Sequence, residues 1–343
     1  MKFVIDQAIP FIKGVFEPYA ETVYKDGGAI CREDLLDADA LVIRTRTRCN
    51  EALLAGTSVK IISTAAIGMD HIDMPFCNDN GIFVQNAPGS NSGGVMNYVF
   101  SALYGAASRE SIPLQGATLG IVGVGNVGSR IESMARHLGF RVLLCDPPRA
   151  EAEGSTQFVA LDYLLENSDI VSLSVPLNPG TQRMAGTDFF AKMKFGAIFI
   201  NTARGEVVDD EALMAAIPKL GPVIIDTWNN EPDVDVNLIK SVTIATPHIA
   251  GYSYQGKQRA TAAAVRAVAR FFKLEALYEF FPATELEELE AVKLDLTGLT
   301  QGQITSVFQY NYPVFTDDFM FRVHPESFEE LRQQYRYRRE FYI

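Results

Sequence analysis

The chain has 343 residues, 48% of them hydrophobic, which is enough for two or three packed domains. The formal net charge of −12 argues against a nucleic acid as partner, and no apolar run approaches the ~20 residues of a membrane-spanning helix. The cysteines form no CxxC pair and the histidines show no metal-ligand spacing, so we expect a cytoplasmic protein with reduced thiols and no metal.

The first part of the chain alternates strand-like and helix-like patterns, which predicts a small α/β domain. Strand-like runs begin at Phe3, Ala40, Lys60 and Ile82. Helical patterns lie over residues 11–19 and 33–36. We expect residues 1–92, together with 256–281, to form a substrate-binding domain.

Three arginines follow the run that begins at Ala40, where Arg44, Arg46 and Arg48 alternate with smaller residues. If the strand continues through them, their guanidinium groups share one face. They would then form a positive patch able to hold an anionic substrate, with Arg44 as the first candidate. The alternative is a solvated edge strand guarded by charge.

A cluster of helix-breaking residues at 86–92 separates this domain from a long apolar helix predicted over 94–108. Six strand-like runs with intervening helical patterns follow, from Leu119 to Ile249. That alternation predicts a parallel sheet covered on both faces, and we assign residues 93–255 to this second domain.

A glycine turn opens the second domain, between its first strand and a helix. Gly123 allows the sharp turn, Gly125 removes a side chain where a pyrophosphate must approach, and Gly128 lets the helix sit close to the strand. Asp146 follows 21 residues after Gly125, at the end of the next strand. A carboxylate there can accept the ribose hydroxyls of NAD and would repel the extra phosphate of NADP. The pattern predicts that the cofactor is NAD.

Three later strands of the same domain end in polar motifs. Arg204 follows one strand, Asp226 and Glu231 follow the next, and His248 follows the last. An arginine can hold a carboxylate by two parallel hydrogen bonds. A histidine can act as a base near neutral pH, and a carboxylate on its other ring nitrogen favours its charged form. Taken alone, each of these side chains would more often be structural or solvated.

The last part of the chain, residues 282–343, is acidic at first and then rich in aromatic residues and arginine. About sixty residues are marginal for an independent core. We therefore expect this piece to pack against a second copy of the chain and to form a homodimer. Four arginines of the piece could take part in that contact: Arg332, Arg336, Arg338 and Arg339.

Four motifs together resemble the D-2-hydroxyacid dehydrogenase family: GVGNVG, NTARG, DTWNNEP and TPHIAG. Further stretches, such as LLCDPPR, RTRTRCNEALLAG and YRYRREF, resemble a branch of that family with a phosphorylated substrate, and this likeness covers essentially the whole chain. The resemblance implies an α/β protein with a Rossmann-type doubly wound parallel sheet, a smaller flavodoxin-like α/β domain and a short C-terminal α+β dimerisation piece.

The resemblance also implies roles for particular residues. The catalytic residues implied are Arg204, Glu231 and His248. The NAD contacts implied are Gly123, Gly125, Asn126, Val127, Gly128, Asp146, Val175, Asp226 and Gly251. The substrate contacts implied are Thr45, Ala66 and Tyr252, to which the basic pattern adds Arg44. Ala66 and Val175 stand where the family usually has threonine.

The resemblance implies oxidation of a small phosphorylated 2-hydroxy acid to its 2-oxo acid, with NAD as cofactor and with neither nucleic acid nor membrane as partner. Two alternatives remain. Another dehydrogenase of the family, such as one for 3-phosphoglycerate, would keep the same three catalytic residues. A non-enzymatic NAD-sensing protein could share the fold, since fold alone does not decide function.

Overall fold

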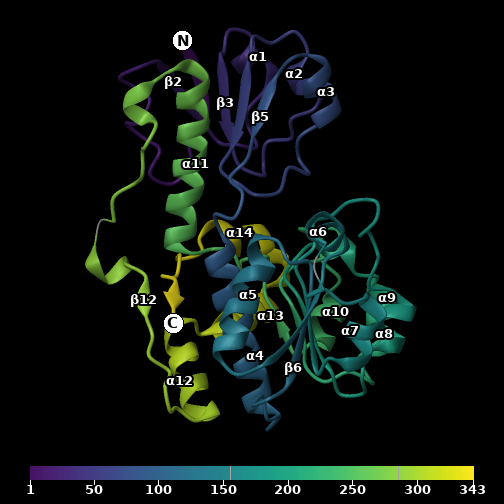
Figure 1. Ribbon diagram of the computed structural model, residues 1–343. Helices are drawn as coiled ribbons and strands as arrows, with labels where there is room; N and C mark the ends of the chain where they lie inside the picture. The colour runs from purple at the N-terminus through teal and green to yellow at the C-terminus, as the bar shows by residue number, and fades with distance from the viewer. Residues whose placement is uncertain (155, 285) are drawn as a thin grey trace. The chain divides into compact units, whose positions relative to one another are not determined.

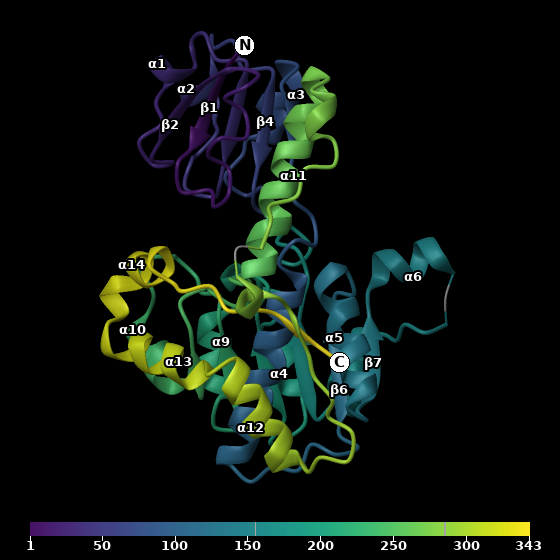
Figure 2. The same ribbon diagram turned by 90° about the vertical axis from the view of Figure 1, so that its left-hand side faces the viewer.

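A computed structural model describes residues 1–154, 156–284 and 286–343. The chain divides into two compact units (Figures 1 and 2). Unit 1 comprises Met1–Asn91 and Ser253–Glu290, and unit 2 comprises Ser92–Tyr252 and Ala291–Ile343. Within the described ranges, no helix combines the length and the apolar character needed to cross a bilayer.

Unit 1 is a five-stranded parallel sheet with helices on both faces. Its strands are β1 (Lys2–Asp6), β2 (Glu21–Lys25), β3 (Ala40–Ile43), β4 (Ile61–Thr64) and β5 (Phe83–Gln85). Its helices are α1 (Arg32–Leu35), α2 (Glu51–Leu54), α3 (Met74–Asp79) and α11 (Tyr254–Phe272), with 3-10 turns η2 (Glu275–Leu277) and η3 (Glu287–Leu289). The strand order β2-β1-β3-β4-β5 is the flavodoxin-like order.

The pleat of the unit 1 strands sends alternate side chains to two cores. Ile5 and Val42 pack with Val265 of α11, whereas Leu41 packs with Leu35 and other residues near α1, α2 and α3. Side chains of a strand alternate between faces, so strands that are apolar throughout require a covering layer on each side.

One sequence prediction in unit 1 is wrong, and the condition on which another depended is not met. Residues 11–19 form turns and bends rather than a helix, because Pro18 interrupts the segment and Phe11 and Gly14 adopt positive φ angles of 61° and 85°. The strand that begins at Ala40 does not continue through the arginines. It ends at Ile43, and the chain then turns, with the Thr47 N–H donating to the carbonyl of Arg44. The three guanidinium groups therefore do not share a strand face.

Unit 2 contains the larger sheet. Its strands are β6 (Thr118–Val122), β7 (Arg141–Cys145), β8 (Ile170–Leu173), β9 (Ile198–Asn201), β10 (Val223–Ile225) and β11 (Ile244–Ala245). Its helices up to Tyr252 are α4 (Ser92–Arg109), α5 (Asn126–His137), α6 (Pro147–Glu153), α7 (Leu161–Asn167), α8 (Thr187–Lys192), α9 (Asp210–Ala216) and α10 (Val236–Ser241), with a 3-10 turn η1 (Gly205–Val207).

Within the described residues, these six strands are parallel and lie in the order β11-β10-β9-β8-β6-β7. Beyond β7, a single parallel bridge joins Leu144 to Phe158, in the position where a classic Rossmann sheet has one more strand. The order reverses between β6 and β8, and ligands of open α/β sheets bind outside the carboxyl ends of the strands at such a point. The predicted α/β fold class with a Rossmann-type sheet is confirmed.

The two faces of this sheet have separate cores. Ile198 and Ile200 of β9 pack with residues of α4 and α5, whereas Phe199, between them, packs with residues of α7, α8 and α9. The two-residue period of the strand explains why a continuous apolar run can serve both cores.

The C-terminal part of the chain belongs to unit 2. It consists of β12 (Val292–Lys293), α12 (Gln301–Asn311), α13 (Val314–Val323), η4 (Pro325–Ser327), α14 (Phe328–Gln333) and β13 (Phe341–Tyr342), with β12 parallel to β13. Phe308 and Phe341 complete the core around α4, and Phe321 and Phe328 complete the core on the other face. Figure 2 shows α13 beside α10, and Arg322 of α13 donates hydrogen bonds to the carbonyls of Ile239 and Val242 there. This piece shares the cores of unit 2 rather than forming one of its own.

Candidate active site

The polar motifs of unit 2 follow strands that are neighbours in the sheet. Arg204 follows β9, Glu231 follows β10 and His248 follows β11, and these three strands are adjacent. Because the strands are parallel, their carboxyl ends meet at one edge of the sheet. The glycine turn after β6 and Asp146 after β7 lie at the same edge.

Glu231 and His248 form a close pair at this edge. The Glu231 Oε2 lies 2.7 Å from the His248 Nδ1, and the Glu231 Oε1 accepts the Trp228 N–H at 2.9 Å. Burial alone would raise the pKa of Glu231, but the charge and hydrogen bond of His248, the Trp228 N–H and the charge of Arg332 bring that pKa below its usual value. An ionised Glu231 accepts a hydrogen bond from the N–H group at Nδ1 of His248. In the neutral imidazole, the free lone pair is then on Nε2.

The backbone around His248 is fixed by a second carboxylate, that of Asp226. His248 has a φ of 54°, a left-handed conformation that costs energy for a non-glycine residue. Asp226, which is 1% exposed, accepts hydrogen bonds from the Ile249 and Ala250 N–H groups at 2.9 and 3.0 Å. Its carbonyl accepts the His248 N–H at 2.7 Å. These contacts hold the strained turn in place.

Asp226 is also the end of a buried hydroxyl chain. Thr246 donates its hydroxyl to Asp226 at 2.6 Å, so the Tyr98 hydroxyl, 2.7 Å away, must donate to Thr246. Burial raises the pKa of Asp226, and the neighbouring His248 and these hydrogen bonds oppose that rise. Asp226 therefore orders the His248 turn in this structure, and its predicted contact with NAD stays a prediction.

The loop that carries Arg204 packs directly against the loop that carries Glu231. A Cβ atom on Gly205 would overlap with the backbone of Trp228, so only glycine allows this approach. Asn201, at the end of β9, donates to the carbonyl of Arg204 at 3.0 Å and accepts the Ala203 N–H at 3.0 Å. The Arg204 Nη1 donates to the carbonyl of Ala203 at 2.8 Å. The half-buried guanidinium is thus held at the strand end.

The glycine turn has the shape that a pyrophosphate needs. Gly123 has a φ of 87°, and a Cβ on Gly128 would overlap with the carbonyl oxygen of Gly123. A Cβ on Gly125, by contrast, would meet no atom within 4 Å, so open space lies beside the start of α5. Asp146 accepts the Val124 N–H at 2.8 Å and the Arg149 N–H at 3.1 Å, so it orders this turn and begins α6.

Three buried hydroxyl groups at the same edge were missed by the sequence analysis. Ser174 follows β8, Thr202 follows β9 and Thr227 follows β10, and each hydroxyl lacks a hydrogen-bond partner within the described part of the chain. Buried polar groups are rarely left unpaired, so these hydroxyls fit the polar groups of a dinucleotide such as NAD. The available signal was their position, because each lies within two residues of a strand end.

The remaining predicted residues are placed as follows. Val175 packs its side chain against the glycine turn, since a Cβ on Gly123 would meet its Cγ1 at 2.8 Å. Gly251 and Tyr252 lie in the turn after His248, where the Tyr252 N–H donates to Ile249 at 2.8 Å. Asn126 and Val127 begin α5.

The predicted substrate contacts Arg44, Thr45 and Ala66 belong to unit 1. Arg44 and the exposed Thr45 follow β3, and Ala66 follows β4. The Arg44 Nε donates to the buried Asp6 at 2.9 Å, and Arg46 pairs with Asp26 at 3.3 Å. Asp6 therefore offsets part of the positive charge that Arg44 could present to an anion.

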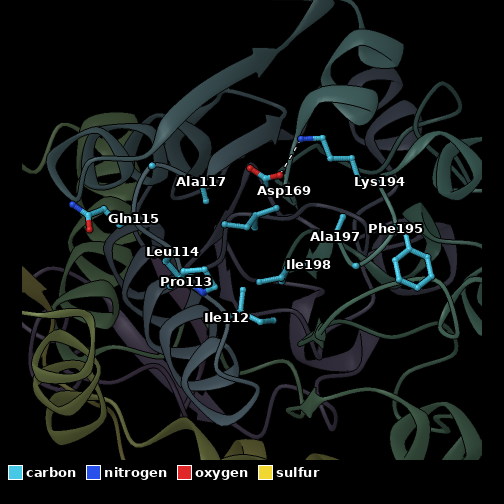
Figure 3. A pocket seen from close by; sticks show the side chains of 13 residues that line it. Ile112, Pro113, Leu114, Gln115, Ala117, Asp169, Lys194, Phe195, Ala197 and Ile198 are labelled. Carbon is cyan, nitrogen blue, oxygen red and sulfur yellow. Dashed lines mark hydrogen bonds and ion pairs between the residues drawn. The ribbon is translucent and has the colours of Figure 1, made fainter.

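A pocket of about 350 Å³ lies elsewhere in unit 2 (Figure 3). Its lining residues include Ala117, Asp169 and Ala197, which directly precede β6, β8 and β9. It is therefore at the amino edge of the sheet, opposite the predicted site residues. Its charged groups, Asp169 and Lys194, pair with each other at 2.9 Å. We do not place the active site there.

Comparison with known proteins agrees with this geometry. A family model described as D-isomer specific 2-hydroxyacid dehydrogenase, NAD binding domain, matches residues 101–250. The NAD⁺-bound 3-phosphoglycerate dehydrogenase of Entamoeba histolytica superposes with a TM-score of 0.69 at 28% identity, covering 83% of this chain and 99% of its own. The D-lactate dehydrogenase of Aquifex aeolicus, complexed with NAD and lactic acid, shares the fold with a TM-score of 0.68 at 24% identity, covering 83% of this chain and 100% of its own.

Two curated relatives match over nearly their full length. Erythronate-4-phosphate dehydrogenase of Bacteroides fragilis is 42% identical, covering 99% of this chain and 97% of its own. The protein of the same name from Escherichia coli O127:H6 is 39% identical, covering 99% of this chain and 92% of its own. The chain therefore belongs to the D-2-hydroxyacid dehydrogenase family and is an NAD-dependent oxidoreductase. The resemblance found from its motifs is confirmed, and its full-length similarity is to the erythronate-4-phosphate dehydrogenases of that family.

Proposed function

We propose that this chain oxidises 4-phospho-D-erythronate to (R)-3-hydroxy-2-oxo-4-phosphooxybutanoate with NAD, as a step of pyridoxal 5'-phosphate biosynthesis. The observation that best supports this reaction is the hydrogen bond of 2.7 Å between Glu231 and His248. Glu231 follows β10, which is next to β9, the strand that precedes Arg204. The substrate is supported by the 42% identity over 99% of the chain to a relative named for it. The NAD⁺-bound 3-phosphoglycerate dehydrogenase covers only 83% of the chain, which makes that alternative weaker.

In the proposed reaction, the lone pair on the His248 Nε2 accepts the proton of the substrate's C2 hydroxyl. Glu231, on Nδ1, stabilises the imidazolium ion that this transfer creates. Arg204 binds the substrate carboxylate through two parallel hydrogen bonds and so fixes the C2 atom relative to the base. NAD, when bound, supplies the acceptor for the C2 hydride. Holding the reactants in this orientation provides much of the rate acceleration.

The residues proposed to hold NAD lie along the carboxyl edge of the unit 2 sheet. The N–H groups at the start of α5 face the open space beside Gly125, where the pyrophosphate would bind. The carboxylate of Asp146 would accept the ribose hydroxyls. Gly251, Asp226 and the three unpaired hydroxyls after β8, β9 and β10 would surround the nicotinamide end.

We propose that Arg44 contributes to binding of the substrate phosphate, with Thr45, Ala66 and Tyr252 as further substrate contacts. Arg44 is held in position by Asp6, which is 0% exposed. A guanidinium that is already oriented loses less conformational freedom when it binds an anion.

A panel of 2-hydroxy acids, each with and without a terminal phosphate, tests this function when NADH formation is followed by absorbance. We expect kcat/KM to be highest for 4-phospho-D-erythronate. A higher value for 3-phosphoglycerate would favour that dehydrogenase instead. NAD binding without turnover of any member would favour the NAD-sensing alternative.

We further propose that the enzyme is a homodimer that works in the cytoplasm. Large apolar side chains of the C-terminal piece are exposed, among them Tyr310 on α12 and Phe319, Met320 and Val323 on α13. Exposed apolar patches of this kind are typical of subunit contacts. The four cysteines are free thiols, which supports a reducing compartment.

A further inference from the structure

Arg332, in the short C-terminal helix α14, is a largely buried cation that the mechanism above does not use. Its side chain is 16% exposed, and its Nη1 pairs with Glu329 at 2.9 Å. Its Nε lacks a hydrogen-bond partner among the residues that the structure describes. Burying a guanidinium with an unpaired N–H costs free energy, so a compensating interaction is expected nearby.

The surroundings of Arg332 belong to the candidate active site. Its guanidinium carbon lies 5.9 Å from the ring centre of Tyr252, which is a predicted substrate contact. Burial alone would lower the pKa of Arg332, but the neighbouring side chains of Tyr252, Glu231 and Glu329 keep that pKa above its ordinary value. The charge of Arg332 is in turn among the influences that hold the pKa of Glu231 below its usual value.

A column of aromatic rings fixes α14 relative to the Glu231 loop. The backbone N–H of Trp228 donates a hydrogen bond to the Glu231 Oε1. The ring centre of Trp228 lies 5.7 Å from that of Phe321 in α13. The Phe321 ring lies 5.7 Å from that of Phe328, the first residue of α14. Phe321 and Phe328 are fully buried, so this packing holds the charge of Arg332 at a fixed position relative to Glu231.

We propose that Arg332 is a positioning residue of the reaction, which holds Glu231 as a carboxylate and limits how strongly that carboxylate favours the protonated form of His248. A buried carboxylate paired with an imidazole favours imidazolium, and an imidazolium cannot accept the substrate proton. A fixed cation near the carboxylate opposes that effect. The C-terminal piece then serves catalysis within its own subunit.

Other charged and titratable groups around the pair must be considered. They are Asp226 after β10, Arg204 after β9, Tyr252 in the turn after His248, and Glu329 beside Arg332 in α14. The C-terminal piece also brings the charge of Asp317 in α13 to act on Asp226 and packs the Tyr335 ring against Tyr252, and from α14 it contributes Arg332 and Glu329. Their opposite charges allow a test in which two substitutions in one helix have effects of opposite sign.

The inference rests on the proposed role of His248 as the base, and its test uses a readout that needs no substrate. The imidazole signal of His248 is followed by NMR as a function of pH, with assignment from a His248→Gln variant. We expect Arg332→Met to raise the midpoint of this titration by about 0.5 to 1 pH unit, and Glu329→Gln to lower it by a smaller amount. Arg332→Lys, which keeps the charge, should restore most of the shift.

Arg336→Met is the matched control, because Arg336 is an exposed arginine of the same tail. It should leave the midpoint unchanged. The acid limb of the pH profile of kcat/KM should move with the midpoint in Arg332→Met. An unchanged midpoint in Arg332→Met, or equal shifts in the Met and Lys variants, would overturn the inference. A shifted midpoint in a protein that oxidises no 2-hydroxy acid would instead contradict the proposed function alone.

Discussion

His248 is the residue on which the proposed chemistry depends most. Its strained backbone, its Glu231 partner and the Asp226 contacts that hold its turn all belong to two neighbouring strand ends, those of β10 and β11. Strain of this kind persists only when the surrounding structure fixes it, and it is common at functional sites. The same contacts leave Nε2 as the nitrogen that can take a proton.

His248→Ala tests this role directly. We expect kcat to fall by about 10³-fold, because the proton acceptor is lost, while NADH binds with near-normal affinity. Steady-state kinetics and NADH fluorescence titration provide the two measurements. His324→Ala is the control, since His324 is half exposed and pairs only loosely with Glu326 at 3.5 Å. Near-normal turnover of His248→Ala would reject the role.

Arg44→Ala tests the proposed phosphate contact. We expect KM for the phosphorylated substrate to rise by about 10-fold or more, and KM for its unphosphorylated analogue to change little, because only the former loses a charge-assisted contact. The ratio of the two KM values is the readout, since it does not depend on any stability lost when Asp6 loses its partner. Arg48→Ala, at an exposed position of the same segment, is the control. Equal increases for both substrates would contradict the assignment.

At the residue scale, the sequence predicts which side chains lie together when their position depends only on the ends of parallel strands. Arg204, Glu231 and His248 could be grouped because parallel strands bring their carboxyl ends to one edge. Arg332 could not be added to them, because its approach to Glu231 depends on how α13 and α14 pack on Trp228. The ion pair of Arg44 with Asp6 could not be predicted either, since the two residues are 38 positions apart in the chain.

In the glycine turn, one glycine is needed for the fold and another is proposed to be needed for NAD binding. Gly128 has no room for a side chain, because the carbonyl of Gly123 occupies the place of its Cβ. Gly125 has room for one in this structure, yet the same space is where we place the pyrophosphate. The two glycines therefore serve different purposes.

Substitution by alanine separates these purposes. We expect Gly128→Ala to lower the free energy of unfolding by about 1–3 kcal/mol through overpacking. Gly125→Ala should leave stability nearly unchanged and raise the Kd for NAD by about 10-fold or more. Thermal unfolding and NADH titration measure both effects, with Gly302→Ala, which meets no atom within 4 Å, as the control. A destabilised Gly125→Ala with unchanged NAD affinity would contradict this account of the turn.

At the element scale, the sequence predicts strands and long helices better than irregular chain. The apolar runs of β6 to β11 are unambiguous because both faces of each strand are buried. Residues 11–19 have apolar residues at helical spacing, but Phe11 and Gly14 adopt positive φ angles and the chain packs as a coil on the sheet. The segment after Ile43 turns, and this turn allows the buried Thr47 hydroxyl to donate a hydrogen bond to the Gly27 carbonyl at 2.8 Å. An extended strand would not bring these two groups together.

The division of the whole molecule into two units separates two kinds of predicted residue. The NAD and proton-transfer residues all lie in unit 2, and Arg44, Thr45 and Ala66 lie in unit 1. The chain passes between the units at three places, after Asn91, after Tyr252 and after Glu290. Composition indicated that the last sixty residues are marginal for an independent core, and in the structure their aromatic residues complete the cores of unit 2.

Dimer formation is tested at the exposed apolar face of α13. Truncation is a poor test, because Phe308, Phe321, Phe328 and Phe341 are needed in the cores of unit 2. Phe319, which is 62% exposed, can be replaced without disturbing a core. We expect the wild-type chain to sediment as a dimer and Phe319→Glu as a monomer, since burying an unpaired carboxylate is costly. Phe195→Glu, at an 85% exposed position in the other part of unit 2, should remain a dimer. A Phe319→Glu variant that stays dimeric would exclude this face.

The most direct test of the central claim follows the hydrogen atom on C2 of the substrate. With 4-phospho-D-erythronate deuterated at C2, we predict that the wild-type enzyme produces NADH carrying one deuterium, as measured by mass spectrometry. The His248→Ala variant should produce almost none. Deuterium released to water, or wild-type enzyme that forms no labelled NADH from this substrate, would contradict the account.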